Sequence, residues 1–129
     1  ALGLSQLKRA DDGLSRRNDI AQKYTKEFEN TEIFSPKVDS NKFHAYHLYV
    51  IRTTRRLELY NYLREHNIFA QVHYIPVHTM PYYKQFGWKK GDCPVAEAYY
   101  EQCLSIPMYP TLTDEDVDFV IISMQDFIK

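Results

Sequence analysis

The run Gln71–His78, QVHYIPVH, contains the residue types best suited to contact a polar ligand. His73, Tyr74 and His78 place two imidazoles and a phenol within six residues, and both groups can donate and accept hydrogen bonds. Pro76 has no N–H for strand pairing, so we expect the backbone to leave a sheet near His73. Polar groups at the end of a strand are held by a rigid scaffold and still face solvent. We therefore place the candidate binding site here.

The same residues also have a purely structural interpretation. Histidine and tyrosine are often half-buried, and such pairs commonly pack without binding anything. His44 and His47 are predicted on opposite faces of one strand, where they cannot hold a metal together. No HExxH or carboxylate pattern accompanies the histidines, and we expect no metal site. The chain also lacks a glycine-rich phosphate loop, a nucleophile elbow and a cysteine in a thiolate-forming context.

Size and composition indicate one globular domain. The chain has 129 residues, a mass of 15.4 kDa, eleven tyrosines and seven phenylalanines. A net charge of -1 argues against nucleic-acid binding and against a polybasic membrane patch. Cys93 and Cys103 show no metal-finger spacing and favour a reducing compartment. No apolar run near the length of a membrane span and no leader is present, so we expect a soluble, cytoplasmic protein.

The first quarter of the chain predicts one long helix. Apolar positions recur at threes, fours and sevens over residues 4–28, with interruptions at Asp11 and Gly13. At about 1.5 Å per residue such a helix is about 40 Å long and overhangs a domain of this size. Because it begins without a capping residue, we expect residues 1–28 to connect to a preceding part of the protein.

Residues 29–129 are predicted to form a two-layer domain of mixed α and β structure. Residues 43–52 are apolar on both alternations, as in a strand covered on both faces. Thr54 is suited to cap a following helix, Asn67 is suited to a left-handed exit from it, and residues 68–72 have the composition of a short strand.

The last third of the chain predicts two helices around a short strand. Asp92 is placed to cap a helix with Pro94 in its first turn and with Ala96, Tyr99, Tyr100 and Cys103 along its inner face. A strand over residues 104–109 is limited by Pro107 to an edge or a strand end. Thr113 is suited to cap the last helix, whose strong apolar stripe contains Val117, Val120, Ile121, Met124 and Ile128.

Four blocks of sequence are specific enough to indicate a family. They are ALGLSQLKRADDGLSRRNDIAQKY, AYHLYVIR, the run from NIFAQVHYIPVH to LSIPMYP, and LTDEDVDFVI. In order and spacing they resemble the C-terminal domain of the DegT/DnrJ/EryC1/StrS family of pyridoxal-phosphate-dependent sugar aminotransferases, over nearly the whole chain. Within that family, VHYIPVH and the following KKGDCPVAEAYYEQCLSIPMYP run are most similar to the UDP-4-amino-4,6-dideoxy-N-acetyl-altrosamine transaminases of pseudaminic acid biosynthesis.

The resemblance implies an α/β fold of the aspartate aminotransferase type, fold type I. A large domain holds pyridoxal phosphate, and a two-layer small domain with a small, mostly antiparallel sheet packs on it. Residues 29–129 would be this C-terminal small domain and residues 1–28 the connecting helix. The lysine that bonds to the cofactor would lie in the missing N-terminal domain, since no lysine here matches it. We therefore expect the 129-residue chain alone to bind the cofactor weakly, if at all, and to be inactive.

For the whole protein, the resemblance implies a homodimer that moves an amino group from L-glutamate to a UDP-linked 4-keto-6-deoxy sugar. By matching the family's HYxPxH pattern, His73 and Tyr74 would contact the sugar nucleotide, and His78 would support them or make a further contact. Two alternatives stay open. In the first, the protein would belong to a branch of the family that dehydrates the sugar instead. In the second, the chain would be a non-catalytic module that binds sugar nucleotides or serves regulation.

Overall fold

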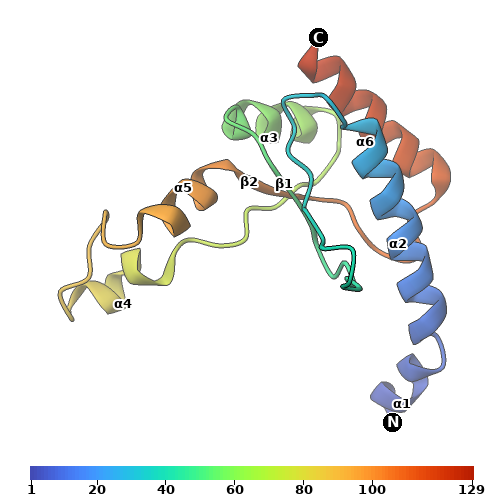
Figure 1. Ribbon diagram of the computed structural model, residues 1–129, viewed down its shortest axis with the longest axis horizontal. Coiled ribbons are helices and arrows are strands. Elements are labelled where there is room, and N and C mark those ends of the chain that lie inside the picture. The colour runs from blue at the N-terminus through green and yellow to red at the C-terminus, as the bar shows by residue number, and fades with distance from the viewer.

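A helical body and a projecting arm meet at a small antiparallel sheet (Figure 1). The computed structural model describes all residues, 1–129. Its elements, in chain order, are α1 (Leu2–Leu7), α2 (Ala10–Glu27), β1 (Tyr49–Arg52), α3 (Arg56–Glu65), the short 3-10 helix η1 (Val77–Thr79), α4 (Pro81–Lys84), α5 (Pro94–Gln102), β2 (Cys103–Ile106) and α6 (Asp114–Ile128). The body contains α2, α3 and α6, and the arm, residues 73–102, carries η1, α4 and α5.

The sheet has two strands, each extended by one bridge. β1 pairs antiparallel with β2, with Tyr49 opposite Ile106. Phe34 bridges Arg52 on the outer side of β1, and Gln71 bridges Ser105 on the outer side of β2. The predicted small, mostly antiparallel sheet is thus confirmed. β2 is an internal strand rather than an edge, and it ends just before Pro107, whose nitrogen cannot donate to a ladder.

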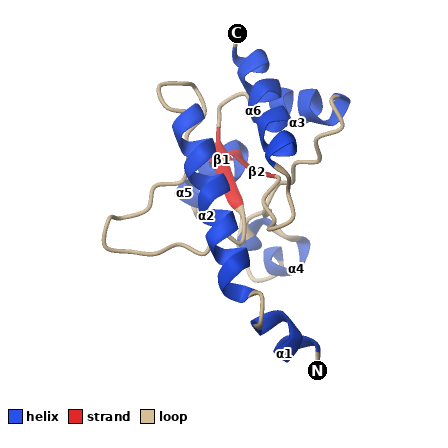
Figure 2. Ribbon diagram, turned by 90° about the vertical axis from the view of Figure 1, so that its right-hand side faces the viewer, coloured by secondary structure: helices blue, strands red, loops and turns tan.

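The hydrophobic core lies between the sheet and the helices of the body. All four residues of β2 are buried, and Leu104 shares one cluster with Tyr24 of α2, Leu59 of α3 and Met124 of α6. Figure 2 shows β1 beside α2, with α3 and α6 on another side of the sheet. The apolar stripe predicted for α6 is confirmed at its four fully buried positions, while Ile128 is half-buried. Apolar burial of this kind is the main favourable term in folding.

The long N-terminal helix predicted over residues 4–28 is divided into two. The division falls at Lys8 and Arg9 rather than at Asp11 or Gly13, both of which lie within α2. None of α1 is buried, and only the second half of α2 contributes to the core. Figure 1 shows α1 turned away from the axis of α2. The two helices therefore do not form one rigid rod.

The two strands predicted before the arm are shorter than expected. Only residues 49–52 of the predicted strand 43–52 pair, and Phe43 remains 73% exposed. His44 and His47 precede the strand and are exposed, so the prediction that they lie on its two faces is wrong. Residues 68–72 contribute only the single bridge at Gln71. The apolar composition of these segments reflects side chains at the surface as well as strand pairing.

The helix caps follow the prediction at one end of the chain only. Thr113 caps α6 through a capping box, in which its hydroxyl accepts from the Asp116 N–H and the Asp116 carboxylate accepts from the Thr113 N–H. The predicted caps Thr54 and Asp92 are wrong, because α3 begins after Arg55 and α5 after Cys93, neither with a side-chain cap. Asn67 does adopt the predicted left-handed conformation, with φ at 58°.

Candidate functional site

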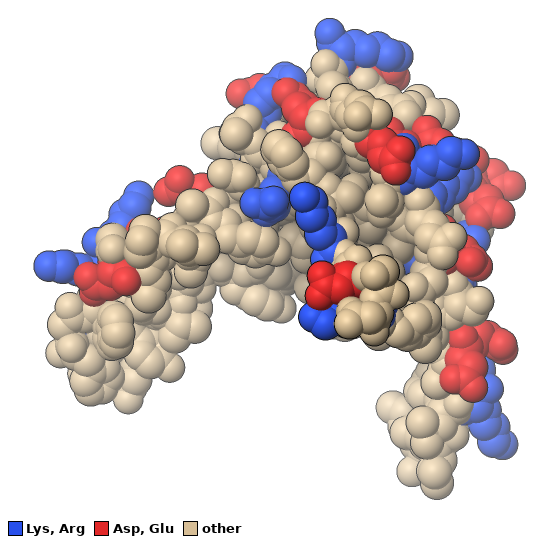
Figure 3. Space-filling model, in the orientation of Figure 1, with Lys and Arg blue, Asp and Glu red and all other residues tan.

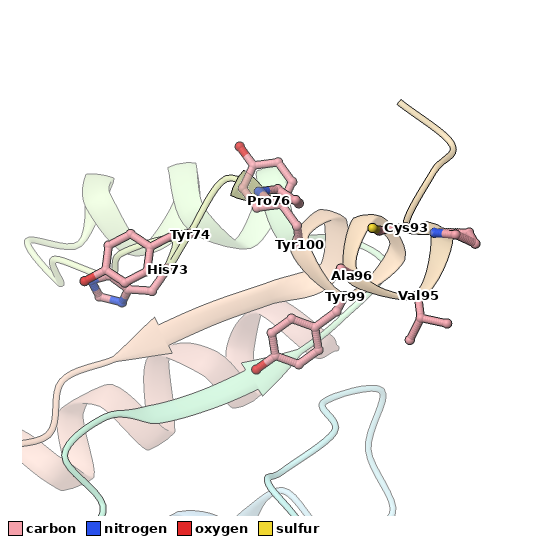
Figure 4. A pocket seen from close by; sticks show the side chains of 9 residues that line it. His73, Tyr74, Pro76, Cys93, Val95, Ala96, Tyr99 and Tyr100 are labelled. Carbon is pink, nitrogen blue, oxygen red and sulfur yellow. The ribbon is translucent and has the colours of Figure 1, made fainter. Parts of the chain in front are cut away.

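The QVHYIPVH run leaves the sheet at Gln71 and passes alongside α5 before it enters η1. A hollow of about 640 Å³ lies between this run and the helix. Figure 4 shows His73, Tyr74 and Pro76 on one side and residues of α5 on the other. The helix contributes Cys93, Val95, Ala96, Tyr99 and Tyr100. Two of the three predicted site residues, His73 and Tyr74, therefore line one hollow.

α5 presents its side chains to this hollow rather than to a core. The predicted inner face is confirmed only at Cys103, which is buried but begins β2; no residue of α5 itself is buried, and Tyr99 is 44% exposed. Aromatic and apolar side chains at such a surface stack well against a sugar or base ring. The helix therefore lines the hollow and contributes no residue to the hydrophobic core.

The imidazole of His73 is oriented by the neighbouring strand. Its Nδ1 lies 2.8 Å from the Ser105 Oγ, and Ser105 is buried in the middle of β2. The Cys103 thiol lies 3.6 Å from the carbonyl oxygens of both His73 and Tyr100, and its single proton is shared between these two acceptors. Burial raises the pKa of the Cys103 thiol, which favours the protonated form that donates. Two buried side chains of β2 thus hold both the ring and the backbone of His73.

Tyr74 extends toward solvent beside His73. It is 72% exposed, and its ring packs edge-to-face on the His73 ring with centroids 4.6 Å apart. The peptide bond between the two residues is cis. The phenol has no protein partner among the hydrogen bonds of the chain, so its donor and acceptor capacity is free for a ligand.

His78 is anchored away from the hollow. Its Nε2 lies 2.8 Å from Glu97 Oε1, and the two side chains are only 9% and 12% exposed. The same carboxylate oxygen accepts from the backbone N–H groups of Gly91, at 2.7 Å, and Cys93, at 3.4 Å. The hydrogen bond from His78, followed by that from Gly91, lowers the pKa of Glu97. Glu97 therefore joins η1, the 87–92 loop and the start of α5.

His78 does not line the hollow formed by His73 and Tyr74, and its ring bonds to Glu97 instead. Sequence reasoning missed its partner Glu97, although this residue is the acid in the first turn of α5 and such acids commonly interact with free N–H groups at a helix start. The predicted cap Asp92 instead accepts from the Lys89 N–H. Glu97 accepts from the Gly91 and Cys93 N–H groups, which precede the helix, and α5 has no side-chain cap.

Basic side chains of the arm surround a second hollow, of about 500 Å³. Lys84, Lys89 and Lys90 line it together with Trp88 and Glu101, and Lys90 forms an exposed ion pair with Glu101 at 3.5 Å. Figure 3 shows acidic and basic side chains interspersed over the visible face, with no large surface of one sign.

The residues present do not make up a site for a lysine-bound cofactor. Eight of the nine lysines are exposed, and the ninth, Lys23, is half-buried and paired with Asp118. No lysine lines the hollow at His73. No three His, Cys, Asp or Glu side chains are grouped as metal ligands. No helix in the structure combines the length and hydropathy needed to cross a bilayer.

The chain belongs to the DegT/DnrJ/EryC1/StrS aminotransferase family, whose sequence model matches residues 1–125. It is 45% identical to the spore coat polysaccharide biosynthesis protein SpsC of Bacillus subtilis, over all of this chain and 36% of that protein. It is 35% identical to a UDP-4-amino-4,6-dideoxy-N-acetyl-beta-L-altrosamine transaminase of Campylobacter jejuni, over 93% of this chain and 33% of that enzyme.

The fold agrees with this family. The putative sugar aminotransferase Spr1654 of Streptococcus pneumoniae, solved in its PLP form, superposes with a TM-score of 0.90 at 30% identity, over 97% of this chain and 33% of that one. The predicted fold class, the small α/β domain of PLP-dependent transferases, is thereby confirmed. The chain spans about a third of the length of the relatives it matches.

Proposed function

We propose that this chain is the C-terminal, substrate-contacting domain of a PLP-dependent aminotransferase that moves an amino group from L-glutamate to a nucleotide-linked 4-keto-6-deoxy sugar. The observation that carries the proposal is the family match over residues 1–125. The chain spans about a third of the length of its relatives, and in this proposal the cofactor is held mainly by another part of the whole protein. Bound there, pyridoxal phosphate supplies the electron sink for amino transfer.

The residues of this chain bind and orient the sugar nucleotide. His73 offers an imidazole whose direction is set by Ser105, and Tyr74 offers a free phenol beside it. A hydrogen bond from either group to a sugar hydroxyl or to the diphosphate would fix the keto carbon relative to the cofactor. His78 and Glu97 hold the following segment in place, so the contact residues are presented on a supported loop.

The comparisons bear on which sugar to test first. Identity is higher to SpsC, at 45%, than to the altrosamine transaminase, at 35%. UDP-linked 4-keto-6-deoxy-N-acetylhexosamine, a precursor in pseudaminic acid biosynthesis, is nevertheless the first sugar to test, because the VHYIPVH segment resembles that group of enzymes. The whole protein would act as a cytoplasmic homodimer.

The test uses the protein expressed from its full-length gene, with glutamate as donor. Release of 2-oxoglutarate on addition of glutamate, followed by amination of a keto sugar nucleotide, would support the proposal. Dehydration of the sugar without 2-oxoglutarate release would place the protein in the dehydratase branch. Absence of both reactions, with the sugar nucleotide still bound, would favour the non-catalytic module.

The His73 assignment has its own test in the same full-length protein. His73→Ala should raise the KM for the sugar nucleotide about 10-fold or more, since a hydrogen bond to a charged group contributes about 1.5–3 kcal/mol. The KM for glutamate should stay within about twofold of the wild-type value. A matched control is His66→Ala, because His66 lies at the end of α3 and bonds only to the Tyr62 carbonyl oxygen. An unchanged KM for the sugar nucleotide in the His73→Ala variant would remove His73 from the site.

A further inference from the structure

A third hollow, of about 410 Å³, lies between residues 34–48 and β1. Tyr99 belongs to this hollow and also to the one at His73, so α5 separates two adjoining spaces. Besides Tyr99, the ionisable residues that line the third hollow are Lys37, His44 and Arg52, and no carboxylate lines this hollow. On the face seen in Figure 3 the charged side chains are mixed in sign, whereas this hollow is lined by cations without an acid.

Arg52 is held in place but its charge is not neutralised. Its backbone N–H and C=O both bond to Phe34, at 3.0 Å and 2.8 Å. The guanidinium lies 5.6 Å from the centre of the Phe34 ring, an arrangement that stabilises the cation. Arg52 takes part in none of the ion pairs of the chain. The planar fork of N–H donors is therefore positioned and available.

His44 presents a donor to the same hollow. Its Nδ1 accepts the Tyr46 N–H at 2.9 Å, and its ring packs on the Tyr46 ring with centroids 4.4 Å apart. Because Nδ1 is occupied as an acceptor, the ring proton must lie on Nε2. The Asn18 side chain bonds to the His44 carbonyl oxygen at 3.3 Å and fixes the backbone. The free nitrogen of His44 is thus an N–H donor in either charge state.

The remaining polar groups complete a lining rich in donors. Lys37 has only N–H donors. The Tyr99 hydroxyl, like that of an ordinary tyrosine, is protonated at neutral pH and can donate, and partial desolvation raises its pKa further. Arginine, lysine, an imidazole N–H and a phenol together are complementary to a carboxylate or a phosphate and poorly suited to a cation.

We propose that the hollow lined by Lys37, His44, Arg52 and Tyr99 is an anion subsite that takes an oxyanion group of a substrate. This inference rests on the proposed function, which supplies two sources of that chemistry: a carboxylate of the amino donor and a phosphate of the sugar nucleotide. Tyr99 places the subsite next to the His73 hollow, so one ligand or two neighbouring ligands can occupy both spaces.

The test compares Arg52→Gln with the wild type in the full-length protein. Glutamine keeps a polar side chain but removes the charge and the fork. The control is Arg64→Gln, because the Arg64 guanidinium also lies over a phenylalanine ring, 6.0 Å from Phe69, but outside this hollow. Two constants are measured: the glutamate concentration for half-maximal 2-oxoglutarate release, and the KM for the sugar nucleotide.

Arg52→Gln should raise one of these constants about 10-fold, the effect of losing a charge-assisted hydrogen bond at a solvent-accessible site, and Arg64→Gln should raise neither. A rise confined to glutamate identifies the donor carboxylate as the occupant, and a rise confined to the sugar nucleotide identifies the phosphate. If both constants stay within about twofold, or if Arg64→Gln has the same effect as Arg52→Gln, the subsite is refuted.

A binding measurement separates this inference from the proposed function. Inorganic phosphate and glutarate are titrated against wild-type and Arg52→Gln protein, with the shift in thermal unfolding temperature as the signal. Stabilisation by either anion that is lost in the Arg52→Gln variant, but kept in the Arg64→Gln variant, supports the subsite even if no amino transfer is found. Equal responses of the three proteins to both anions would overturn it even if amino transfer is demonstrated.

Discussion

Replacing Ser105 with alanine tests how the structure orients its principal candidate residue. The Ser105 Oγ lies 2.8 Å from His73 Nδ1, and Ser105 itself is only 5% exposed. The strand should persist, because the backbone bonds between Ser105 and Gln71, at 2.8 Å and 3.0 Å, do not involve the side chain. A neutral hydrogen bond contributes about 1 kcal/mol, with a range of about 0.5–1.5 kcal/mol. His73 is half-buried, so water can replace part of the lost bond.

The expected result of Ser105→Ala is a decrease of about 1 kcal/mol in the free energy of unfolding and, in the full-length protein, a rise of about five-fold in the KM for the sugar nucleotide. Urea unfolding of the 129-residue chain measures the first quantity, and initial rates measure the second. Ser123→Ala is the control, because Ser123 is also 5% exposed but lies on α6, which lines no part of the His73 hollow. If His73→Ala raises this KM while Ser105→Ala leaves it unchanged, Ser105 does not set the direction of the imidazole.

Three further predictions concern the support of the site and the stability of the body. The pKa of Glu97 is lowered in the folded chain, so its ionised form stabilises the folded state above the ordinary carboxyl pKa, and this contribution is lost as the pH falls through the lowered value. The wild type should therefore unfold at a higher temperature than Glu97→Gln at pH 7, and this difference should disappear in acid. A difference that persists unchanged to pH 2 would contradict the prediction. Thr113→Ala should decrease the free energy of unfolding by about 1 kcal/mol, because it removes the hydroxyl that caps α6; urea denaturation measures the change, and Thr111→Ala, at an exposed position outside the helices, should have no comparable effect. In the folded chain Cys93, which is half-buried, should react with a thiol reagent faster than Cys103, which is buried with a raised pKa; equal rates under native conditions would show that β2 opens readily.

Local patterns predicted the parts of the fold that are determined locally. The Thr113 cap and the apolar stripe of α6 follow from residues three and four apart, and both are confirmed. The predicted strand over residues 43–52 is confirmed only at Tyr49–Arg52, and its first part did not form for the opposite reason. Strand propensity describes how well a side chain fits a half-buried pleated surface, and Phe43 occupies an exposed loop instead.

The sequence predicted which segment contains the candidate site, but not which side chains its residues contact. The sequence placed His73, Tyr74 and His78 together at a strand end, which the structure bears out for the backbone. It did not reveal which partner each side chain meets. His73 bonds to a serine 32 residues away and His78 to a glutamate 19 residues away, and such pairs depend on how β2 and α5 pack. The separate positions of His73, at the hollow, and His78, bonded to Glu97, follow only from that packing.

The most direct measurement of the central claim is the transfer of labelled nitrogen by the full-length protein. The enzyme is incubated with ¹⁵N-glutamate and a UDP-linked 4-keto-6-deoxy-N-acetylhexosamine, and the sugar product is analysed by mass spectrometry. The proposed function predicts an amino sugar that carries the label, in an amount equal to the 2-oxoglutarate released, and a lower yield at limiting sugar nucleotide with His73→Ala. A sugar product without nitrogen from glutamate, or no turnover of any nucleotide-linked keto sugar, would contradict it.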